Sequence, residues 1–189
     1  GLLTTAGFES SVPLSRARGY GEGLSNFQKG DLPAANRPDP LVPIPLIAGV
    51  RERISGTGEV LMALDVDDMR LQLRKLVDRG AQAFVVSFVN AVTNPEHEKL
   101  AEEVIAAEFP SHMLGSNPVI LGHRVAGRKG EYVRASSAII DAFLHQAMYH
   151  GLSSLELNLR ENQYRRPMLV IHNSGGMAQL NSTDALQTI

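Results

Sequence analysis

Polar and glycine residues that could contact a ligand follow a short apolar segment near the end of the chain. Residues 168–171, Met-Leu-Val-Ile, lead into the turn Asn173-Ser174-Gly175-Gly176. The apolar run predicts a buried strand, and paired glycines let backbone amides approach a ligand or let the chain reverse. Because ligands of open α/β sheets bind at strand ends, we expect the turn to contact one, with simple chain reversal as the alternative.

A second group of candidate residues belongs to a long helix that is predicted to begin near Glu131. Apolar residues recur there at helical spacing, which predicts a wide buried stripe. The stripe consists of Tyr132, Ser136, Ile139, Ile140, Phe143, Leu144, Ala147 and Met148. Arg134, Asp141 and His145 lie on another face of the same helix.

A basic segment, residues 122–130, stands immediately before this helix and contains His123, Arg124, Arg128 and Lys129. The first turn of a helix presents unpaired amides and a positive dipole end, so an anion such as phosphate would be stabilised there. A solvated basic loop is the alternative reading, and the residues leave both open.

The histidines do not have the spacing of a metal site. His97 stands between Glu96 and Glu98, but adjacent helical residues point apart, so we interpret all three as first-turn residues that help a helix to start. His145 and His150 are five residues apart and face different directions. The sequence contains no cysteine, which excludes disulfides and thiolate chemistry. No metal site is therefore predicted.

Helices and strands alternate from residue 65 onward. Asp65 is a suitable cap for a helix that ends near Gly80, and Asn94 caps a second helix with Pro95 at its first position. Near-continuous apolar strands are predicted over residues 83–89 and 119–121. The order predicts an α/β domain of βαβ repeats with a mostly parallel sheet and right-handed crossovers.

The first part of the chain is less regular. Its first five residues resemble the end of a strand, and residues 1–45 are rich in glycine and proline, which predicts a long surface excursion. The turn 55–58 then joins residues 46–54 to 59–62 as a hairpin. We expect a single α/β domain over residues 1–189, or a piece of a larger chain, with 46–189 as the regular part.

The amino-acid composition argues against a nucleic-acid-binding protein and against a membrane-spanning one. The 189 residues are 43% hydrophobic and 20% charged, with a formal net charge of −2, as in an ordinary globular domain. Lysines and arginines are scattered, which argues against nucleic-acid binding. No apolar run approaches the roughly 20 residues of a membrane span. We expect a cytoplasmic protein, and the lack of cysteine suits that compartment.

Six motifs, in this order along the chain, resemble the hydantoinase A, 5-oxoprolinase and acetone carboxylase β-subunit family. They are residues 1–9, 39–43, 50–53, 94–98, 131–137 and 173–176. The resemblance implies one lobe of an ATPase similar to actin, the sugar kinases and Hsp70. It also implies ATP and Mg²⁺ as cofactors and a companion subunit of the hydantoinase B or carboxylase α type.

The implied activity is ATP-dependent activation of a small carbonyl substrate by phosphorylation. Either a cyclic imide or lactam is opened, or a ketone enolate is phosphorylated ahead of carboxylation. The resemblance implies catalytic roles for Glu131, Arg134 and Ser136. It implies nucleotide contact by the turn Asn173, Ser174, Gly175 and Gly176.

The chain also departs from the family pattern. Two glycine-rich phosphate loops of the family, one upstream and one downstream, are missing from these residues. We therefore expect a fragment that folds but turns over no ATP alone. The long glycine-rich excursion is more similar to the acetone carboxylase branch of the family than to the oxoprolinase branch. A noncatalytic assembly module of a multisubunit carboxylase or hydrolase is the alternative function.

Overall fold

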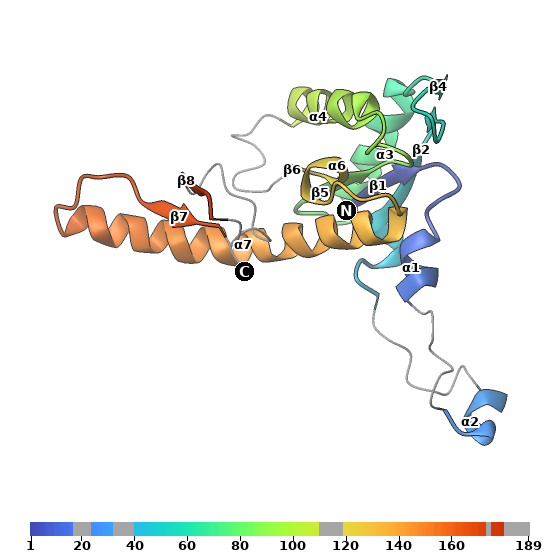
Figure 1. Ribbon diagram of the computed structural model, residues 1–189, viewed down its shortest axis with the longest axis horizontal. Coiled ribbons are helices and arrows are strands. Elements are labelled where there is room, and N and C mark those ends of the chain that lie inside the picture. The colour runs from blue at the N-terminus through green and yellow to red at the C-terminus, as the bar shows by residue number, and fades with distance from the viewer. Residues whose placement is uncertain (17–23, 32–39, 110–118, 173–174, 180–189) are drawn as a thin grey trace.

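A four-stranded parallel sheet forms the centre of the computed structural model, which describes residues 1–16, 24–31, 40–109, 119–172 and 175–179 (Figure 1). The strand order is β2-β1-β5-β6, and all three pairings are parallel. The strands are β1 (Leu2–Thr5), β2 (Ile47–Val50), β5 (Phe84–Ser87) and β6 (Val119–Leu121). The predicted α/β class with a mostly parallel sheet is confirmed.

Helices cover both faces of this sheet. One face packs against α3 (Val66–Asp78) and α4 (Glu96–Glu108), and the other packs against α1 (Ser11–Arg16) and α7 (Glu131–Glu161). Successive strand residues alternate between the two cores, as the two-residue period of a strand requires. Leu2 packs beneath α7, for example, and its neighbour Leu3 packs beneath α3.

Further short helical segments are found among the described residues. They are α2 (Asn26–Gly30), the 3-10 helix η1 (Ile44–Leu46) and α6 (Gly122–Val125). In the parts of the chain that the structure describes, no helix combines the length and apolar character needed to cross a membrane.

The residues predicted to cap or end helices α3 and α4 make the expected local contacts. The Asp65 side chain accepts a hydrogen bond from the backbone amide of Asp68 and caps α3, and Gly80, at φ +86°, ends it. Helix α4 begins one residue later than predicted, with Pro95 in the cap position. Asn94 still accepts a hydrogen bond from the Glu96 amide at 3.0 Å.

The predicted hairpin around residues 55–58 is present. Strand β3 (Arg53–Ile54) pairs antiparallel with β4 (Val60–Met62) across that turn. The segment 46–54, however, is divided between two sheets. Its first part is β2 in the central sheet, and its last two residues are β3 in the hairpin.

Helix α7 begins at Glu131 as predicted, but the predicted buried stripe is wrong in part. Ile140 and Phe143 are exposed, the latter by 79%. The face that lies against the sheet contains Arg134, Ala138 and Asp141, which are all buried. The small alanine lets the helix approach the sheet closely, and Arg134 belongs to the candidate site described below.

The strand predicted over residues 168–171 was placed wrongly. Strand β7 (Leu169–Ile171) pairs antiparallel with β8 (Met177–Gln179) in a separate two-stranded sheet, and Ile171 is 69% exposed. A short apolar run does not specify its partner, and a tight turn joins antiparallel rather than parallel strands.

Candidate functional site

Polar side chains gather at the edge of the sheet where the parallel strands end. In the order β2-β1-β5-β6, the chain leaves β1 toward one side for β2 and then crosses to the other side for β5. The carboxyl ends of β1 and β5 thus form the point at which the winding direction reverses. Ligands of open α/β sheets bind in the crevice at such a point.

One buried hydrogen-bond chain begins at the end of β1. The Thr5 hydroxyl accepts from the Val89 amide at 2.9 Å and donates to the Glu52 carboxylate. The Nδ1 atom of His97 lies 2.7 Å from the other Glu52 oxygen. Thr5, Glu52 and His97 are all at most 3% exposed. This series of hydrogen bonds links the ends of β1 and β5 with the loop after β2 and the first turn of α4.

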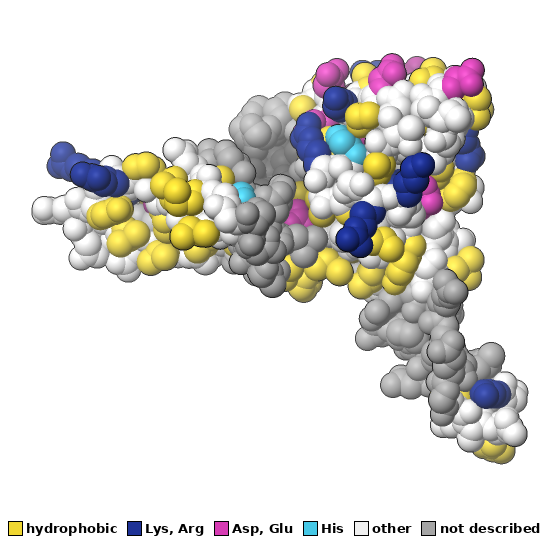
Figure 2. All heavy atoms as spheres, in the orientation of Figure 1, with side chains coloured by type: hydrophobic (Ala, Val, Ile, Leu, Met, Phe, Trp, Pro, Cys, Tyr) yellow, Lys and Arg dark blue, Asp and Glu magenta, His cyan; other side chains and the backbone are white. Residues whose placement is uncertain are grey.

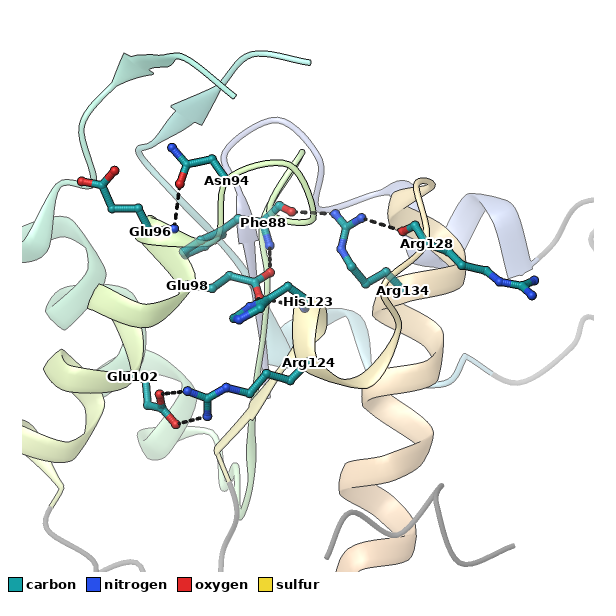
Figure 3. A network of polar contacts seen from close by, with 9 residues as sticks. All are labelled: Phe88, Asn94, Glu96, Glu98, Glu102, His123, Arg124, Arg128 and Arg134. Atoms are coloured by element: carbon teal, nitrogen blue, oxygen red, sulfur yellow. Dashed lines mark hydrogen bonds and ion pairs between the residues drawn. The ribbon is translucent and has the colours of Figure 1, made fainter. Parts of the chain in front are cut away.

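A second buried carboxylate, Glu98, links the ends of β5 and β6 (Figure 3). One of its oxygens accepts from the Phe88 amide at 2.9 Å. The other accepts from the His123 amide at 3.0 Å and lies 2.6 Å from His123 Nδ1. Because Glu98 is fully buried and paired three times, it fixes the two strand ends relative to α4.

Arg134 reaches the same edge from the first turns of α7 (Figure 3). Its guanidinium donates to the Phe88 carbonyl at 2.7 Å and to the Arg128 carbonyl at 3.3 Å, and it lies 3.7 Å from Glu131. The side chain is 1% exposed, yet its Nε has no hydrogen-bond partner among the described residues. A buried cation is thus held by carbonyl dipoles and one weak carboxylate contact.

There is little room for a side chain where β6 passes into α6 at Gly122. A Cβ atom on Gly122 would lie 3.0 Å from the Ser87 hydroxyl and 3.3 Å from Cγ of Arg134. The absence of a side chain therefore lets the end of β6, the end of β5 and Arg134 approach one another.

A small cavity of about 200 Å³ opens beside Arg134. It is lined by Gly56, Asn90, Val92, Thr93, Lys129, Gly130, Glu131 and Arg134. Asn90 takes a left-handed backbone conformation, φ +59°, and its side chain donates to the Ile54 carbonyl at 2.8 Å. That bond holds the turn after β5 against the β3–β4 hairpin and shapes one wall of the cavity.

The predicted site residues are distributed unevenly around this cavity. Glu131 and Arg134 line it, whereas Ser136 does not, although the Ser136 hydroxyl is buried with no hydrogen-bond partner among the described residues. Gly175 and Gly176 lie in the β7–β8 turn, where the Gly175 amide donates to the His172 carbonyl at 2.9 Å. Asn173 and Ser174 lie outside the described residues. Their predicted role in nucleotide contact stays a prediction.

The basic segment before α7 is not simply a solvated loop. His123 is bound to Glu98, and Arg124 forms a two-pronged pair with Glu102 at 2.7 and 2.8 Å. Lys129 lines the cavity with Arg134. The segment thus supplies one structural histidine, one surface ion pair and one cavity cation.

Sequence reasoning missed the buried carboxylates and their histidines. His97 and Glu98 do stand in the first turn of α4, but they are buried and bonded to residues far away in the sequence. The Glu52 partner lies 45 residues before His97, so no local spacing could reveal the pair. Among the described residues, no group of three or more metal-ligating side chains gathers.

A family model for the hydantoinase/oxoprolinase N-terminal region matches residues 1–109. The acetophenone carboxylase gamma subunit of Aromatoleum aromaticum is 39% identical over 188 residues, covering 100% of this chain and 26% of that protein. The caprolactamase subunit alpha of Pseudomonas jessenii is 28% identical over 178 residues, covering 94% of this chain and 24% of that protein. The chain therefore spans about a quarter of the length of these curated relatives.

Two solved structures share the fold. A nucleotide-free structure of acetone carboxylase superposes with a TM-score of 0.76 at 24% identity, covering 100% of this chain and 26% of that chain. The ATP-dependent caprolactamase from Pseudomonas jessenii superposes with a TM-score of 0.68 at 24% identity, covering 94% and 24%. Together with the family match over residues 1–109, the relatives establish that this chain belongs to the hydantoinase/oxoprolinase family.

Proposed function

We propose that this chain acts within a larger ATP-dependent enzyme that activates a small carbonyl compound by phosphorylation. The observation that carries the proposal is the convergence of a buried arginine, a lysine and a carboxylate beside the turn that follows β5, at the carboxyl edge of the parallel sheet. The names of the relatives supply the reaction classes, ketone carboxylation and lactam hydrolysis. Both begin from a carbonyl group that needs activation.

The residues around the cavity suit chemistry in which an oxygen gains negative charge. Lys129 and Arg134 are positioned to stabilise that charge, and Arg134 is already desolvated, so its field is little screened. Glu131, on the same rim, is positioned to accept a proton from the substrate. ATP, when bound, supplies the phosphoryl group, and Mg²⁺ would accompany it on its phosphates.

A labelling experiment tests the proposed chemistry directly. The intact protein with its companion subunit would be given Mg-ATP and a lactam whose carbonyl oxygen is ¹⁸O. If the carbonyl oxygen is phosphorylated, that oxygen leaves with the phosphate, and mass spectrometry should find ¹⁸O in the inorganic phosphate. Unlabelled phosphate, formed while the lactam is opened, would show that ATP activates something other than the substrate carbonyl.

A specific observation favours assembly with another subunit, which we propose is of the hydantoinase B or carboxylase α type. Exposed apolar side chains gather on the distal part of α7 and on the β7–β8 hairpin (Figure 2). They are Leu155, Leu157, Leu169, Ile171 and Met177, each at least 49% exposed. We refer to them as the apolar surface. Groups of exposed apolar side chains on globular domains usually mark contacts with protein or ligand.

The same surface supports the second candidate, a noncatalytic assembly module. Calorimetry with Mg-ATP separates the two candidates when the chain alone is compared with the complete complex. Nucleotide binding by the complex supports the enzyme function. We also propose that this enzyme is cytoplasmic. If neither sample binds Mg-ATP, the assembly role becomes the better description.

A further inference from the structure

We propose that the cavity beside Arg134 receives the carbonyl substrate, as a compact molecule of one ring or less, and not the nucleotide. This inference rests on the proposed function and assigns one part of it to named residues. It concerns the walls contributed by the turn after β5, the β3–β4 hairpin and the start of α7.

Size is the first argument. The cavity measures about 200 Å³. Pockets for drug-sized ligands and cofactors usually measure roughly 300–1,000 Å³. A nucleotide with its base, ribose and phosphates therefore exceeds this cavity, whereas a ketone, lactam or cyclic imide of a few carbons does not.

The charges of the lining residues are the second argument. Lys129 and Arg134 contribute two cations and Glu131 one anion, so the lining carries a net positive charge. Val92 adds an apolar side chain, and Asn90 and Thr93 add neutral polar ones. Such a set accommodates a largely neutral molecule while favouring negative charge on one of its oxygens.

Buried polar groups without partners are the third argument. Arg134 is 1% exposed and its Nε has no hydrogen-bond partner among the described residues. The N-terminus of α7 stands at the same cavity, and its cap residue, Gly130, provides no side-chain bond to the first amides. The first amides of α7 would gain from an oxygen acceptor in the cavity, and the buried charge of Arg134 would act on that oxygen through its field.

The walls are also preorganised. Asn90 is fixed by its bond to the Ile54 carbonyl, and the Asn94 side chain donates to the Gly58 carbonyl at 3.0 Å. These two bonds join the turn after β5 to the β3–β4 hairpin on either side of the hairpin turn. A cavity held by such bonds loses little entropy when it binds a ligand.

A substitution that fills the cavity tests the inference. Val92→Phe adds a ring to the lining, whereas Val133→Phe adds the same ring at a half-exposed position of α7 that does not line the cavity. The intact protein and both variants would be titrated by calorimetry with ε-caprolactam, with acetophenone and with Mg-ATP. Circular dichroism would check that each variant is folded.

We expect Val92→Phe to weaken caprolactam and acetophenone binding by about tenfold or more, equivalent to at least about 1.4 kcal/mol. Val133→Phe should bind them as the natural protein does, and Mg-ATP affinity should stay within about twofold in both. Because Val92→Phe could disturb its own turn, Lys129→Gln serves as a second variant at an exposed position. It should also weaken both carbonyl compounds without affecting Mg-ATP.

Four results would each overturn the inference. If Val92→Phe weakens Mg-ATP instead, the cavity belongs to the nucleotide, and the proposed function still stands. If the natural protein binds Mg-ATP but neither carbonyl compound, or if Val92→Phe and Lys129→Gln both bind these compounds normally, the substrate lies elsewhere. If it binds neither Mg-ATP nor a carbonyl compound, the proposed function fails together with the inference.

Discussion

Arg134 is the residue on which the candidate site depends most, because its buried charge joins α7 to the end of β5. Arg134→Ala would leave the Phe88 carbonyl buried without its 2.7 Å donor. We expect the free energy of unfolding to fall by about 2 kcal/mol or more, since an unsatisfied partner of a charged group is costly. Urea denaturation measures the loss.

Arg124→Ala is the matched control for this prediction. Its guanidinium pairs with Glu102, but the two side chains are 53% and 35% exposed. Surface pairs contribute about 0–1 kcal/mol, so the control should change little. Equal losses in the two variants would contradict a special role for the buried guanidinium.

Glu98 is the corresponding anion at the other side of the site. Glu98→Ala would remove the acceptor of the Phe88 amide and of two His123 groups. We expect a loss of about 3 kcal/mol or more in the free energy of unfolding, because breaking a buried pair leaves its partners uncompensated. Glu98→Gln, which keeps one acceptor oxygen, should lose less.

Glu102→Ala provides the comparison, because Glu102 lies on the same helix, one turn further on, with a partly exposed carboxylate. In thermal or urea unfolding, Glu98→Ala should lose more stability than either Glu98→Gln or Glu102→Ala. If Glu98→Ala is no less stable than Glu102→Ala, the three hydrogen bonds of Glu98 do not hold the strand ends.

At the residue scale, sequence reasoning pointed to the start of α7 but not to the buried carboxylates Glu52 and Glu98. The basic segment before the helix predicted an anion site there, and the roles of Arg134 and Glu131, which the family resemblance implies, stay predictions. Glu52 and Glu98 receive their function from partners that only the fold brings near. His97 lies 2.7 Å from Glu52 across 45 residues of sequence, and no periodicity encodes that distance.

At the scale of elements, the passage from β6 into α6 depends on a missing side chain. We expect Gly122→Ala to lower the free energy of unfolding by about 1–3 kcal/mol, because its Cβ would crowd Ser87 and Arg134. Gly127→Ala is the control, since its Cβ would meet no atom within 4 Å. Indistinguishable urea midpoints for the two variants would contradict this account of the close approach.

The start of α3 contributes a pH-dependent term through Asp68. Burial tends to raise the pKa of this carboxyl, but the hydrogen bonds from the Arg51 amide and from Gln72, with the Arg51 charge, outweigh it. The pKa is therefore lowered from 3.8. A lowered folded-state pKa means that stability is present above the unfolded value and is lost as the pH falls through the folded one.

Asp68→Asn checks the sign of this term. The natural protein should be more stable than the variant at neutral pH, and the difference should shrink as the pH falls below 3.8. Denaturant unfolding at a series of pH values measures it. A difference that grows on acidification would mean that the carboxyl is destabilising in its ionised form.

Elements with strong local signals were predictable, and the orientation of α7 was not. Helix α3 carries its cap, its apolar period and its terminating glycine in consecutive residues, so its bounds follow from local chemistry. Helix α7 has apolar residues on more than one face. Its sheet-facing side was decided by the polar contacts of Arg134 and by the small Ala138, which hydrophobic periodicity alone cannot weigh.

At the scale of the whole molecule, the compact α/β body and the distal α7 with its hairpin differ in what they bury. The sheet and its flanking helices contain both hydrophobic cores. The apolar surface lies beyond them, at the end of the molecule opposite to the β3–β4 hairpin (Figures 1 and 2). The strand β7 was predicted to be buried because its residues are apolar, and that apolar character is explained if another protein segment covers it.

The chain alone should therefore associate through the apolar surface. Leu157→Glu combined with Ile171→Glu places two charges where the side chains are 61% and 69% exposed. Light scattering over a range of concentrations should show association of the natural chain and a monomeric variant. The unfolding midpoint should stay unchanged, because exposed side chains contribute little to the core.

Leu61→Glu, on β4 and equally 61% exposed, is the matched control and should associate like the natural chain. A lowered unfolding midpoint in the double variant would instead place these side chains in the packed interior, and unchanged association would leave the apolar surface without a role in assembly.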